Sequence, residues 1–263
     1  MIGAGNMGEA LIRGLLAAKT VSPARIIAAD VRAERREFLV KTFGVQAVDD
    51  NVEAAKAADI VLLAVKPQQM GDVLAGLKSV VAGSKLFVSI AAGVTIRSIE
   101  RELGGKVRVV RVMPNTPALV GAGAAALAKG TYATEDDLAT VESILGAVGI
   151  SVRVEERLLD AVTALSGSGP AYVFYVTEVM IKAGVAAGLD EAVAKRLAIQ
   201  TVYGAGKLLV EGKDEPESLR RNVTSPGGTT EAALRVMNER GLERIFAEAI
   251  QAAEKRSREL SGS

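Results

Sequence analysis

Two glycine-rich loops, far apart in the sequence, have the residue types that hold anionic ligands. The first is Gly3-Ala4-Gly5-Asn6-Met7-Gly8, which leads directly into a helical pattern. Its first glycine permits a tight turn, its second lets the backbone approach a pyrophosphate, and its third allows close helix–strand packing. The free N–H groups at the start of the helix would face the phosphates. The loop predicts a dinucleotide site, although the same pattern also suits an ordinary turn before a helix.

Charged residues further along the chain bear on the choice of cofactor. Asp30 ends the next apolar run, roughly 20 residues after the last glycine, where a ribose 2′-OH is expected to bind. Arg32, Arg35 and Arg36 could instead hold a 2′-phosphate, or form a solvated first turn of a helix. Asp30 favours NAD and the arginines favour NADP, so this choice stays open. Lys66 ends another predicted strand, where it either contacts the nicotinamide side of the cofactor or is solvated.

The second loop is Ser225-Pro226-Gly227-Gly228-Thr229-Thr230, and a helical pattern follows it at once. Its two glycines free the backbone to turn N–H groups toward a ligand, and the helix start adds further donors. Thr229 or Thr230 could cap the helix or face the ligand. The loop predicts an anion cradle, and the alternative is an ordinary loop with an N-cap.

The elements that must position these loops alternate between two patterns up to about residue 155. Short, β-branched apolar runs predict strands that are covered on both faces, and the intervening segments have apolar residues three and four apart. This alternation predicts an α/β fold with a Rossmann-type, doubly wound, mostly parallel sheet. The expected strands are 26–29, 60–65, 86–90, 107–113, 124–128 and 150–154, and the expected helices are 9–18, 35–43, 69–80, 97–103 and 135–147.

After residue 155 the strand pattern stops and helical segments follow one another. They are expected at 158–165, 171–187, 191–211, 218–222, 230–239 and 242–260. We therefore predict a dinucleotide-binding domain over residues 1–155 and an all-helical domain for dimerisation and substrate binding over residues 156–263. The segment that follows Pro170 is apolar nearly all round, so we expect it to be buried against other helices, those of a second subunit included.

Composition excludes several classes of protein. The chain has no histidine and no cysteine, which removes disulfides, thiolate nucleophiles and the commonest metal ligand and general base, so no metal site is expected. A formal net charge of +1 gives no reason to expect nucleic acid as a partner. The most apolar segment contains Glu178 and Lys182, so no membrane span is expected, and without a signal-peptide pattern the expected location is the cytoplasm.

The strand that should precede the first loop is nearly absent. Only Met1 and Ile2 stand before Gly3, whereas a central strand usually has about five residues. We expect either that the start of the chain is missing or that a shortened first strand weakens the site.

Six blocks of sequence resemble the pyrroline-5-carboxylate reductase family, in the family's order and spacing. They are GAGNMGEAL, AVKPQ, SIAAGVTI, PNTPA, LSGSGPAYVF and SPGGTTEAAL, and the last corresponds to the family's signature region. The resemblance spans essentially the whole chain. It implies a Rossmann-type first domain, a helical second domain that forms a homodimer, and dimers assembled into a larger ring such as a decamer. It also implies NAD(P)H-dependent reduction of 1-pyrroline-5-carboxylate to L-proline, the last step of proline biosynthesis.

The resemblance also implies roles for individual residues. NADPH is the expected cofactor, with NADH as the alternative. The implied cofactor contacts are the Gly3-to-Gly8 loop, Asp30, Asn51, Ala64, Val65, Lys66, Pro67, Ala91, Ala92 and Asn222. The implied substrate contacts are Val223, Ser225, Gly227, Gly228, Thr229 and Thr230, with the catalytic Thr230 hydroxyl near the imine nitrogen. Lys213 stands near a position where some members have an acidic residue that contacts the product, which puts that contact in doubt.

This chemistry suits a chain without histidine. A pyrroline nitrogen can arrive already protonated, so a hydroxyl that hydrogen-bonds it suffices while the cofactor delivers hydride to the imine carbon. Ser166 is a further candidate ligand within a hinge at 166–170, and Asn115 or Thr116 a further candidate near the substrate.

Two alternatives remain from the sequence. One is another Rossmann reductase of the 3-hydroxyacid dehydrogenase type, in which a catalytic lysine lies early in the first long helix of the second domain. Here the first lysine of that stretch is Lys182, too far along the helix. The other is a non-catalytic NAD(P)-binding regulatory protein, which the short first strand favours and the intact second loop disfavours.

Overall fold

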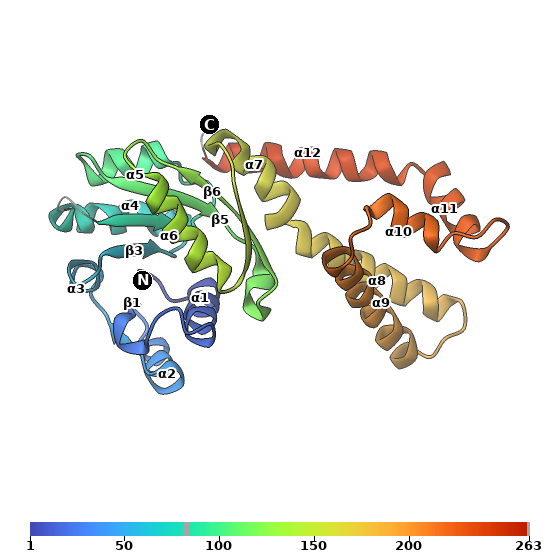
Figure 1. Cartoon of the computed structure of the whole chain (residues 1–263), viewed down its shortest axis with the longest axis horizontal. Coiled ribbons are helices and arrows are strands. Elements are labelled where there is room, and N and C mark those ends of the chain that lie inside the picture. The colour runs from blue at the N-terminus through green and yellow to red at the C-terminus, as the bar shows by residue number, and fades with distance from the viewer. Residues whose placement is uncertain (82–84, 262–263) are drawn as a thin grey trace. The chain divides into compact units, whose positions relative to one another are not determined.

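The structure is a computed structural model that describes residues 1–81 and 85–261. The chain forms two compact units (Figure 1). The first unit contains residues 1–168 together with the chain from residue 252 onward, and the second contains residues 169–251. The last turns of the chain therefore belong to the same compact unit as its beginning.

A twisted sheet forms the centre of the first unit. In chain order its strands are β1 (Ile27–Ala29), β2 (Gln46–Val48), β3 (Ile60–Leu63), β4 (Leu86–Ser89), β5 (Arg108–Met113), β6 (Gly123–Lys129) and β7 (Gly149–Arg153). β1 pairs with β2, and the other strands lie in the order β3-β4-β5-β6-β7. All neighbouring pairs are parallel except β5 with β6. The predicted doubly wound, mostly parallel sheet is confirmed.

The short segment before the first glycine loop joins the two parts of this sheet. Ile2 forms parallel bridges with Ala29 of β1 on one side and Leu63 of β3 on the other. The Ile2 N–H donates to the Leu62 carbonyl at 2.8 Å, and the Gly3 N–H donates to the Ala29 carbonyl at 2.9 Å. A single bridging residue thus fills the central position between β1 and β3, from which the glycine loop starts.

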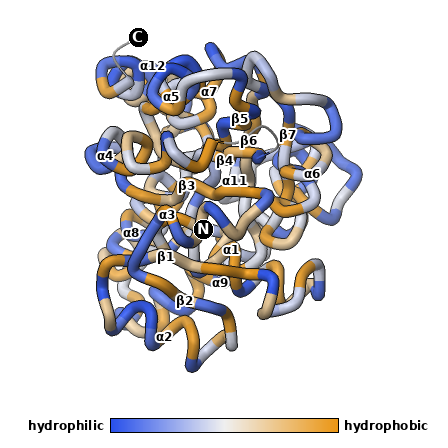
Figure 2. Tube along the Cα trace, turned by 90° about the vertical axis from the view of Figure 1, so that its left-hand side faces the viewer, coloured by the Kyte–Doolittle hydropathy of each residue, from blue (hydrophilic) through white to orange (hydrophobic). Residues whose placement is uncertain are grey.

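Helices cover both faces of the sheet. They are α1 (Asn6–Ala17), α2 (Ala33–Phe43), α3 (Asn51–Lys56), α4 (Pro67–Leu77), α5 (Ile96–Leu103) and α6 (Glu135–Gly146), with short 3-10 turns at Pro23–Arg25, Lys78–Val80, Thr116–Val120 and Glu156–Leu158. One core cluster joins α3, α4 and α5 to the sheet around Phe87, and a second joins α1 and α6 around Val110. Figure 2 shows hydrophobic residues along the strands, β3 among them. The core therefore fixes the strand ends where the site lies.

The remaining elements are helical. They are α7 (Leu159–Val162), a π-helical turn (Thr163–Gly167), α8 (Gly169–Ala186), α9 (Glu191–Glu211), α10 (Pro216–Asn222), α11 (Thr229–Glu239) and α12 (Leu242–Ser261). α8 packs against α9 within the second unit. The end of α12 packs in the first unit, where the Ser257 hydroxyl donates to Asp160 Oδ1 at 2.6 Å.

The predicted strands and helices are all present, with ends that differ by a few residues. The sequence patterns missed β2 and α3, because elements this short show no periodicity. α8 differs from the expectation of burial: within the described chain none of its residues is buried, and Phe174 and Tyr175 are 62% and 65% exposed. Among the described residues no helix has the length and apolar character needed to cross a membrane.

Candidate functional site

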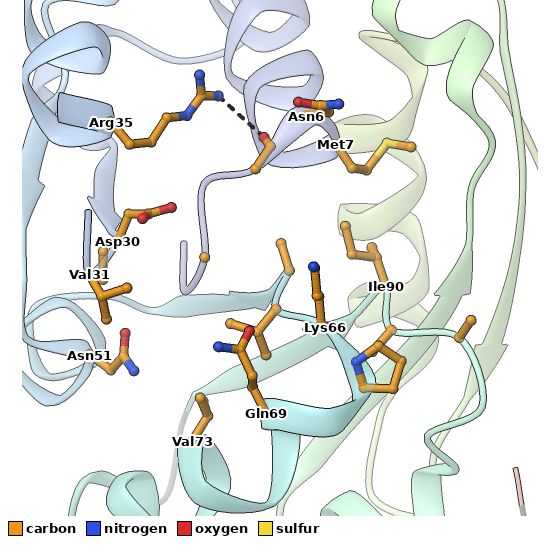
Figure 3. Close-up of a pocket in the computed structure, with 18 of the residues that line it drawn as sticks. Asn6, Met7, Asp30, Val31, Arg35, Asn51, Lys66, Gln69, Val73 and Ile90 are labelled. Carbon is orange, nitrogen blue, oxygen red and sulfur yellow. Dashed lines mark hydrogen bonds between the residues drawn. The ribbon is translucent and has the colours of Figure 1, made fainter. Parts of the chain in front are cut away.

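A cavity of about 780 Å³ lies in the first unit, at the carboxyl ends of β1, β3, β4 and β5 (Figure 3). Strand ends at one edge of a parallel sheet are the usual place for a ligand. The predicted cofactor residues that line this first cavity are Gly3, Gly5, Asn6, Met7, Asp30, Asn51, Ala64, Val65, Lys66, Pro67, Ala91 and Ala92. The structure thus brings together residues from segments that are far apart in the sequence.

The three glycines of the first loop have different surroundings. Gly3 has a φ of +82°, and a Cβ there would lie 3.0 Å from the Ala64 carbonyl. A Cβ on Gly8 would lie 3.1 Å from the Gly3 carbonyl oxygen, whereas a Cβ on Gly5 would meet no atom within 4 Å. Gly3 and Gly8 are therefore required by the turn and by packing, while Gly5 faces open space at the N-terminus of α1.

Ala4 does not line the first cavity but holds the loop in place. It is fully buried, and its N–H donates to Asp30 Oδ2 at 3.2 Å. Gly8 is buried as well. Ala4 and Gly8, both predicted as cofactor contacts, are therefore buried residues that do not line the first cavity.

Arg35 also stabilises the first loop through hydrogen bonds. Its Nε donates to the Ala4 carbonyl at 2.5 Å, and its Nη2 donates to Glu9 at 2.7 Å. The same Nη2 donates to the Gly5 carbonyl at 3.4 Å (Figure 3). Burial alone would raise the pKa of Glu9, but hydrogen bonds from Arg13 and Arg35 lower it below its ordinary value. In this structure Arg35 is a support of the glycine loop.

Arg36 has a similar structural position. Its Nη1 donates to the carbonyls of Asp30 and Val31 at 2.9 and 3.0 Å, and its Nη2 lies 3.6 Å from Asp49. Like Arg35, it binds backbone carbonyls at the edge of the first cavity. Arg32 is thus the member of this basic group that faces solvent, with 57% of its side chain exposed.

Asp30 and Arg32 form a bidentate pair on the wall of the first cavity. Asp30 Oδ1 accepts from the Arg32 backbone N–H at 3.0 Å and from Arg32 Nε at 3.1 Å, and Oδ2 accepts from Arg32 Nη2 at 3.2 Å. Burial alone would raise the pKa of Asp30, but the hydrogen bonds from Arg32 and Ala4 lower it below its ordinary value. The carboxylate stays ionised and fixes the guanidinium beside the cavity.

Several lining residues were missed by the sequence patterns. They are Val31, Gln69, Val73, Ile90 and Met113. Each lies at the end of a strand, just after one, or in the first turns of a helix that follows one, and this position was the signal that could have identified them. Lys66 is the N-cap of α4, ahead of Pro67 at the first helical position, and its side chain points into the cavity (Figure 3).

The second glycine loop lies in the second unit, before α11. The Gly228 N–H donates to the Ser225 carbonyl at 3.0 Å and closes a turn in which Gly227 has a φ of +69°. A Cβ on Gly228 would lie 2.5 Å from Ser225 Oγ, whereas a Cβ on Gly227 would meet no atom within 4 Å. The Gly227 N–H donates to Glu231 Oε2 at 2.8 Å.

A second cavity, of about 610 Å³, borders this loop. Its lining residues are Thr224, Gly227, Gly228, Glu231, Ala232, Leu234, Arg235, Asn238 and Glu239. Thr229 and Thr230 form the first turn of α11, and no hydrogen bond engages either hydroxyl group within the described residues. The loop therefore offers free hydroxyl groups and the N–H groups of a helix start.

The other predicted residues of the second unit lie near this loop in sequence. Asn222 ends α10, and Val223 follows it with 67% of its surface exposed. Lys213 is exposed in the segment between α9 and α10. None of these three residues lines the first or the second cavity.

Asn115 connects two segments in the interior of the first unit. Its Oδ1 accepts from the Ala124 N–H at 2.9 Å, and its Nδ2 donates to the Ser166 carbonyl at 3.1 Å. The Ser166 hydroxyl donates to the Val162 carbonyl at 3.1 Å. Both side chains, which the sequence offered as candidate ligands, are engaged with protein backbone.

Comparisons with known proteins identify the family. Residues 156–260 match the model "Pyrroline-5-carboxylate reductase dimerisation", and residues 1–93 match "NADP oxidoreductase coenzyme F420-dependent". Pyrroline-5-carboxylate reductase of Synechocystis is 44% identical over 260 residues, covering 99% of this chain and 97% of the relative. The chain belongs to the pyrroline-5-carboxylate reductase family. The Arabidopsis thaliana pyrroline-5-carboxylate reductase is 42% identical, covering 100% of this chain and 95% of the relative.

Solved structures of pyrroline-5-carboxylate reductases have the same fold. The enzyme from Coxiella burnetii is 40% identical, with a TM-score of 0.95 and coverage of 99% of this chain and 97% of that chain. The Plasmodium falciparum pyrroline carboxylate reductase, solved with NADP bound, is 32% identical, with a TM-score of 0.87 and coverage of 99% and 96%. The resemblance expected from the sequence motifs is confirmed.

Proposed function

We propose that this protein reduces 1-pyrroline-5-carboxylate to L-proline with NADPH, the last step of proline biosynthesis. Membership of the family, with 44% identity across almost the whole of a curated pyrroline-5-carboxylate reductase, is the observation that supports this most strongly. In the overall reaction the imine carbon gains a hydride, the ring nitrogen keeps a proton, and NADPH becomes NADP⁺. The rival assignment to a 3-hydroxyacid dehydrogenase has no comparable support.

The first cavity has the features that a dinucleotide needs. Gly5 leaves open space beside the N-terminus of α1, where N–H groups and the helix dipole favour phosphate. The relative from Plasmodium falciparum was solved with NADP, which favours NADPH over NADH. We propose that the cofactor contacts the predicted residues that line this cavity, and Asn222 in addition, and that it supplies the hydride.

The second glycine loop is the proposed holder of the substrate. The carboxylate of 1-pyrroline-5-carboxylate would accept from N–H groups of Gly227, Thr229 and Thr230, with Val223, Ser225 and Gly228 around it. The Thr230 hydroxyl would hydrogen-bond the imine nitrogen and keep its proton in place while the carbon accepts hydride. The absence of histidine fits this arrangement, because no stronger acid is needed.

The proposed assembly is a homodimer, and we propose in addition that dimers associate into a larger ring such as a decamer. The dimerisation model matches residues 156–260, and α8 exposes apolar side chains along its length. The proposal includes a cytoplasmic location, where NADPH is regenerated. We propose that residues 1–155 form the dinucleotide-binding domain, and that residues 156–263 form the domain that makes the substrate and dimer contacts.

Substitution of Thr230 tests the mechanism. Thr230→Ala is expected to lower kcat by about 100-fold, because it removes the hydrogen bond that holds the protonated nitrogen in place. The Kd for NADPH should change little, because the first cavity is untouched. The measurement is NADPH oxidation, followed by absorbance with 1-pyrroline-5-carboxylate, together with NADPH binding by fluorescence.

Thr230→Ser keeps the hydroxyl group and serves as the control, with most activity expected to remain. An unchanged kcat in Thr230→Ala would remove this residue from the mechanism. Wild-type protein that binds NADPH without oxidising it would select the non-catalytic alternative, and turnover with hydroxyacids alone would select the dehydrogenase.

A further inference from the structure

A carboxylate of the protein itself accepts a hydrogen bond from one of the N–H groups of the second glycine loop. Glu231 Oε2 accepts from the Gly227 N–H at 2.8 Å. Gly227 is the residue of this loop with open space beside it, since a Cβ there would meet no atom within 4 Å. The loop proposed to hold the carboxylate of a substrate therefore already holds a carboxylate.

Charge makes it unfavourable for two carboxylates to share this place. Like charges a few ångströms apart repel, and the N–H group of Gly227 can donate one strong hydrogen bond. A substrate carboxylate that approaches the loop must therefore replace Glu231 or bind against its charge.

The structure offers Glu231 a second partner. Arg235 lies four residues further along α11 and lines the same second cavity. Within the described residues Arg235 forms no ion pair or hydrogen bond, and a glutamate with an arginine four residues later is the favourable order on a helix. The Glu231 side chain is exposed, so it can turn from Gly227 toward Arg235 without moving the backbone.

We propose that Glu231 takes the place of the substrate carboxylate in the ligand-free protein and turns to Arg235 when the substrate binds. This inference rests on the proposed function, because it assigns the Gly227 N–H to the substrate. It makes Glu231 a built-in competitor that sets the substrate affinity of the loop, and Arg235 the residue that makes its release easier.

Binding of L-proline tests this proposal directly on the full-length protein with NADP⁺ present. Calorimetry should give a Kd for L-proline about threefold to tenfold lower for Glu231→Gln and Glu231→Ala, the size expected for one exposed hydrogen bond. Arg235→Ala should raise the Kd by a similar factor, since Glu231 then has no second partner. L-prolinamide, which lacks the carboxylate, should bind the wild type and both Glu231 variants equally.

Glu239→Gln is the matched control. Glu239 lies on the same helix and lines the same cavity, but it forms no hydrogen bond with the loop within the described residues. Its neutralisation should leave the Kd for L-proline unchanged, which separates direct competition from a general effect of charge.

Two results would overturn the inference alone, and a third would overturn it together with the proposed function. If Glu231→Gln binds L-proline as weakly as the wild type, or more weakly, then Glu231 supports the turn and does not compete. Equal tightening by Glu239→Gln would assign the effect to net charge. A wild-type protein that neither binds L-proline nor oxidises NADPH with 1-pyrroline-5-carboxylate would refute the proposed function itself, and the inference with it.

Discussion

Arginine side chains near the first cavity show how residue type alone leaves a role open. The spacing of Arg32, Arg35 and Arg36 after a strand suits a clamp for a 2′-phosphate. Arg35 and Arg36 instead donate to backbone carbonyls, of Ala4 and Gly5 in one case and of Asp30 and Val31 in the other. Asp30 holds Arg32 in a bidentate pair at the wall of the cavity, and a guanidinium held in this way can still donate to a phosphate.

Removal of Arg32 should therefore shift the cofactor preference. We expect Arg32→Ala to raise the Kd for NADPH by about tenfold, because a charge-assisted contact with the 2′-phosphate is lost from a partly exposed site. NADH affinity should stay constant or improve, since Asp30 becomes free to accept from the ribose hydroxyl group. Fluorescence titration with each reduced cofactor measures both values.

Arg25 provides the control for this prediction. It lies in the Pro23–Arg25 turn of the same unit and does not line the first cavity. Arg25→Ala removes the same charge and should leave both Kd values unchanged. Equal weakening of NADPH and NADH by Arg32→Ala would show that Arg32 supports the site without recognising the 2′-phosphate.

Among the secondary-structure elements, the long ones could be predicted from the sequence and the short ones could not. Periodic apolar residues predicted α9 with the bounds that the structure has, Glu191–Glu211. The sequence patterns did not predict β2 and α3, because three residues of strand and six of helix are too short to show a period. This matters for the site, because α3 begins at Asn51. The family resemblance implied Asn51 as a cofactor contact, but the sequence patterns predicted no helix or strand at that position.

The candidate site shows the same division. The first glycine loop and Asp30 were found from spacing, and the structure brings them to one cavity. The Glu231 contact with Gly227 was not foreseen, because it depends on a side-chain orientation that spacing does not determine. Asn115 was predicted as a candidate ligand because it is a polar residue that follows a strand. The structure shows that its side chain instead binds the backbone of Ser166 and Ala124.

An ion pair joins β5 to the Glu156–Leu158 turn, and Glu156 also contacts the start of α5. Arg111 is 5% exposed in the middle of β5, its Nη1 donates to Glu156 Oε1 at 3.0 Å, and the same oxygen accepts from the Ile96 N–H at 2.7 Å. We expect Glu156→Ala to lower the free energy of unfolding by about 2–3 kcal/mol, less than for a fully buried pair because Glu156 is partly exposed. Urea unfolding at one fixed protein concentration measures this change.

The double variant identifies the cause. Arg111→Met together with Glu156→Ala leaves no unpaired charge in the core, so it should be more stable than Glu156→Ala alone. If the double variant is the less stable of the two, Arg111 stabilises the fold through its own packing, and an unpaired charge is not the cause of the loss in Glu156→Ala.

On the scale of the whole molecule, the exposed apolar side chains of α8 indicate that the chain is stable as an oligomer. Phe174 and Tyr175 are each more than half exposed within the chain, on a helix that the dimerisation model includes. Burial of such side chains is favourable by roughly 25 cal/mol per Å², so a free surface of this kind favours association. The apolar pattern after Pro170 predicted this association, although burial within the chain was not found.

A charge placed on α8 should therefore disrupt the assembly. Phe174→Glu is expected to lower the mass measured by light scattering at micromolar concentration to that of a single chain. Val120→Glu is the control, because Val120 is 80% exposed but lies in the first unit, outside residues 156–260. A single-chain mass for the wild type would contradict the proposed dimer.

The return of α12 to the first unit has a consequence for synthesis in the cell. Ser257 binds Asp160, and the backbone of Leu260 lies within 3.2 Å of the place where a Cβ on Gly93 would stand. A ribosome makes these turns after residues 1–168 and after the whole second unit, whereas domains of most proteins fold as they emerge, beginning from the N-terminus. The first unit can therefore complete its packing only after residues 252–261 have been made, and a nascent chain stalled at residue 251 would lack the contacts that α12 makes with that unit.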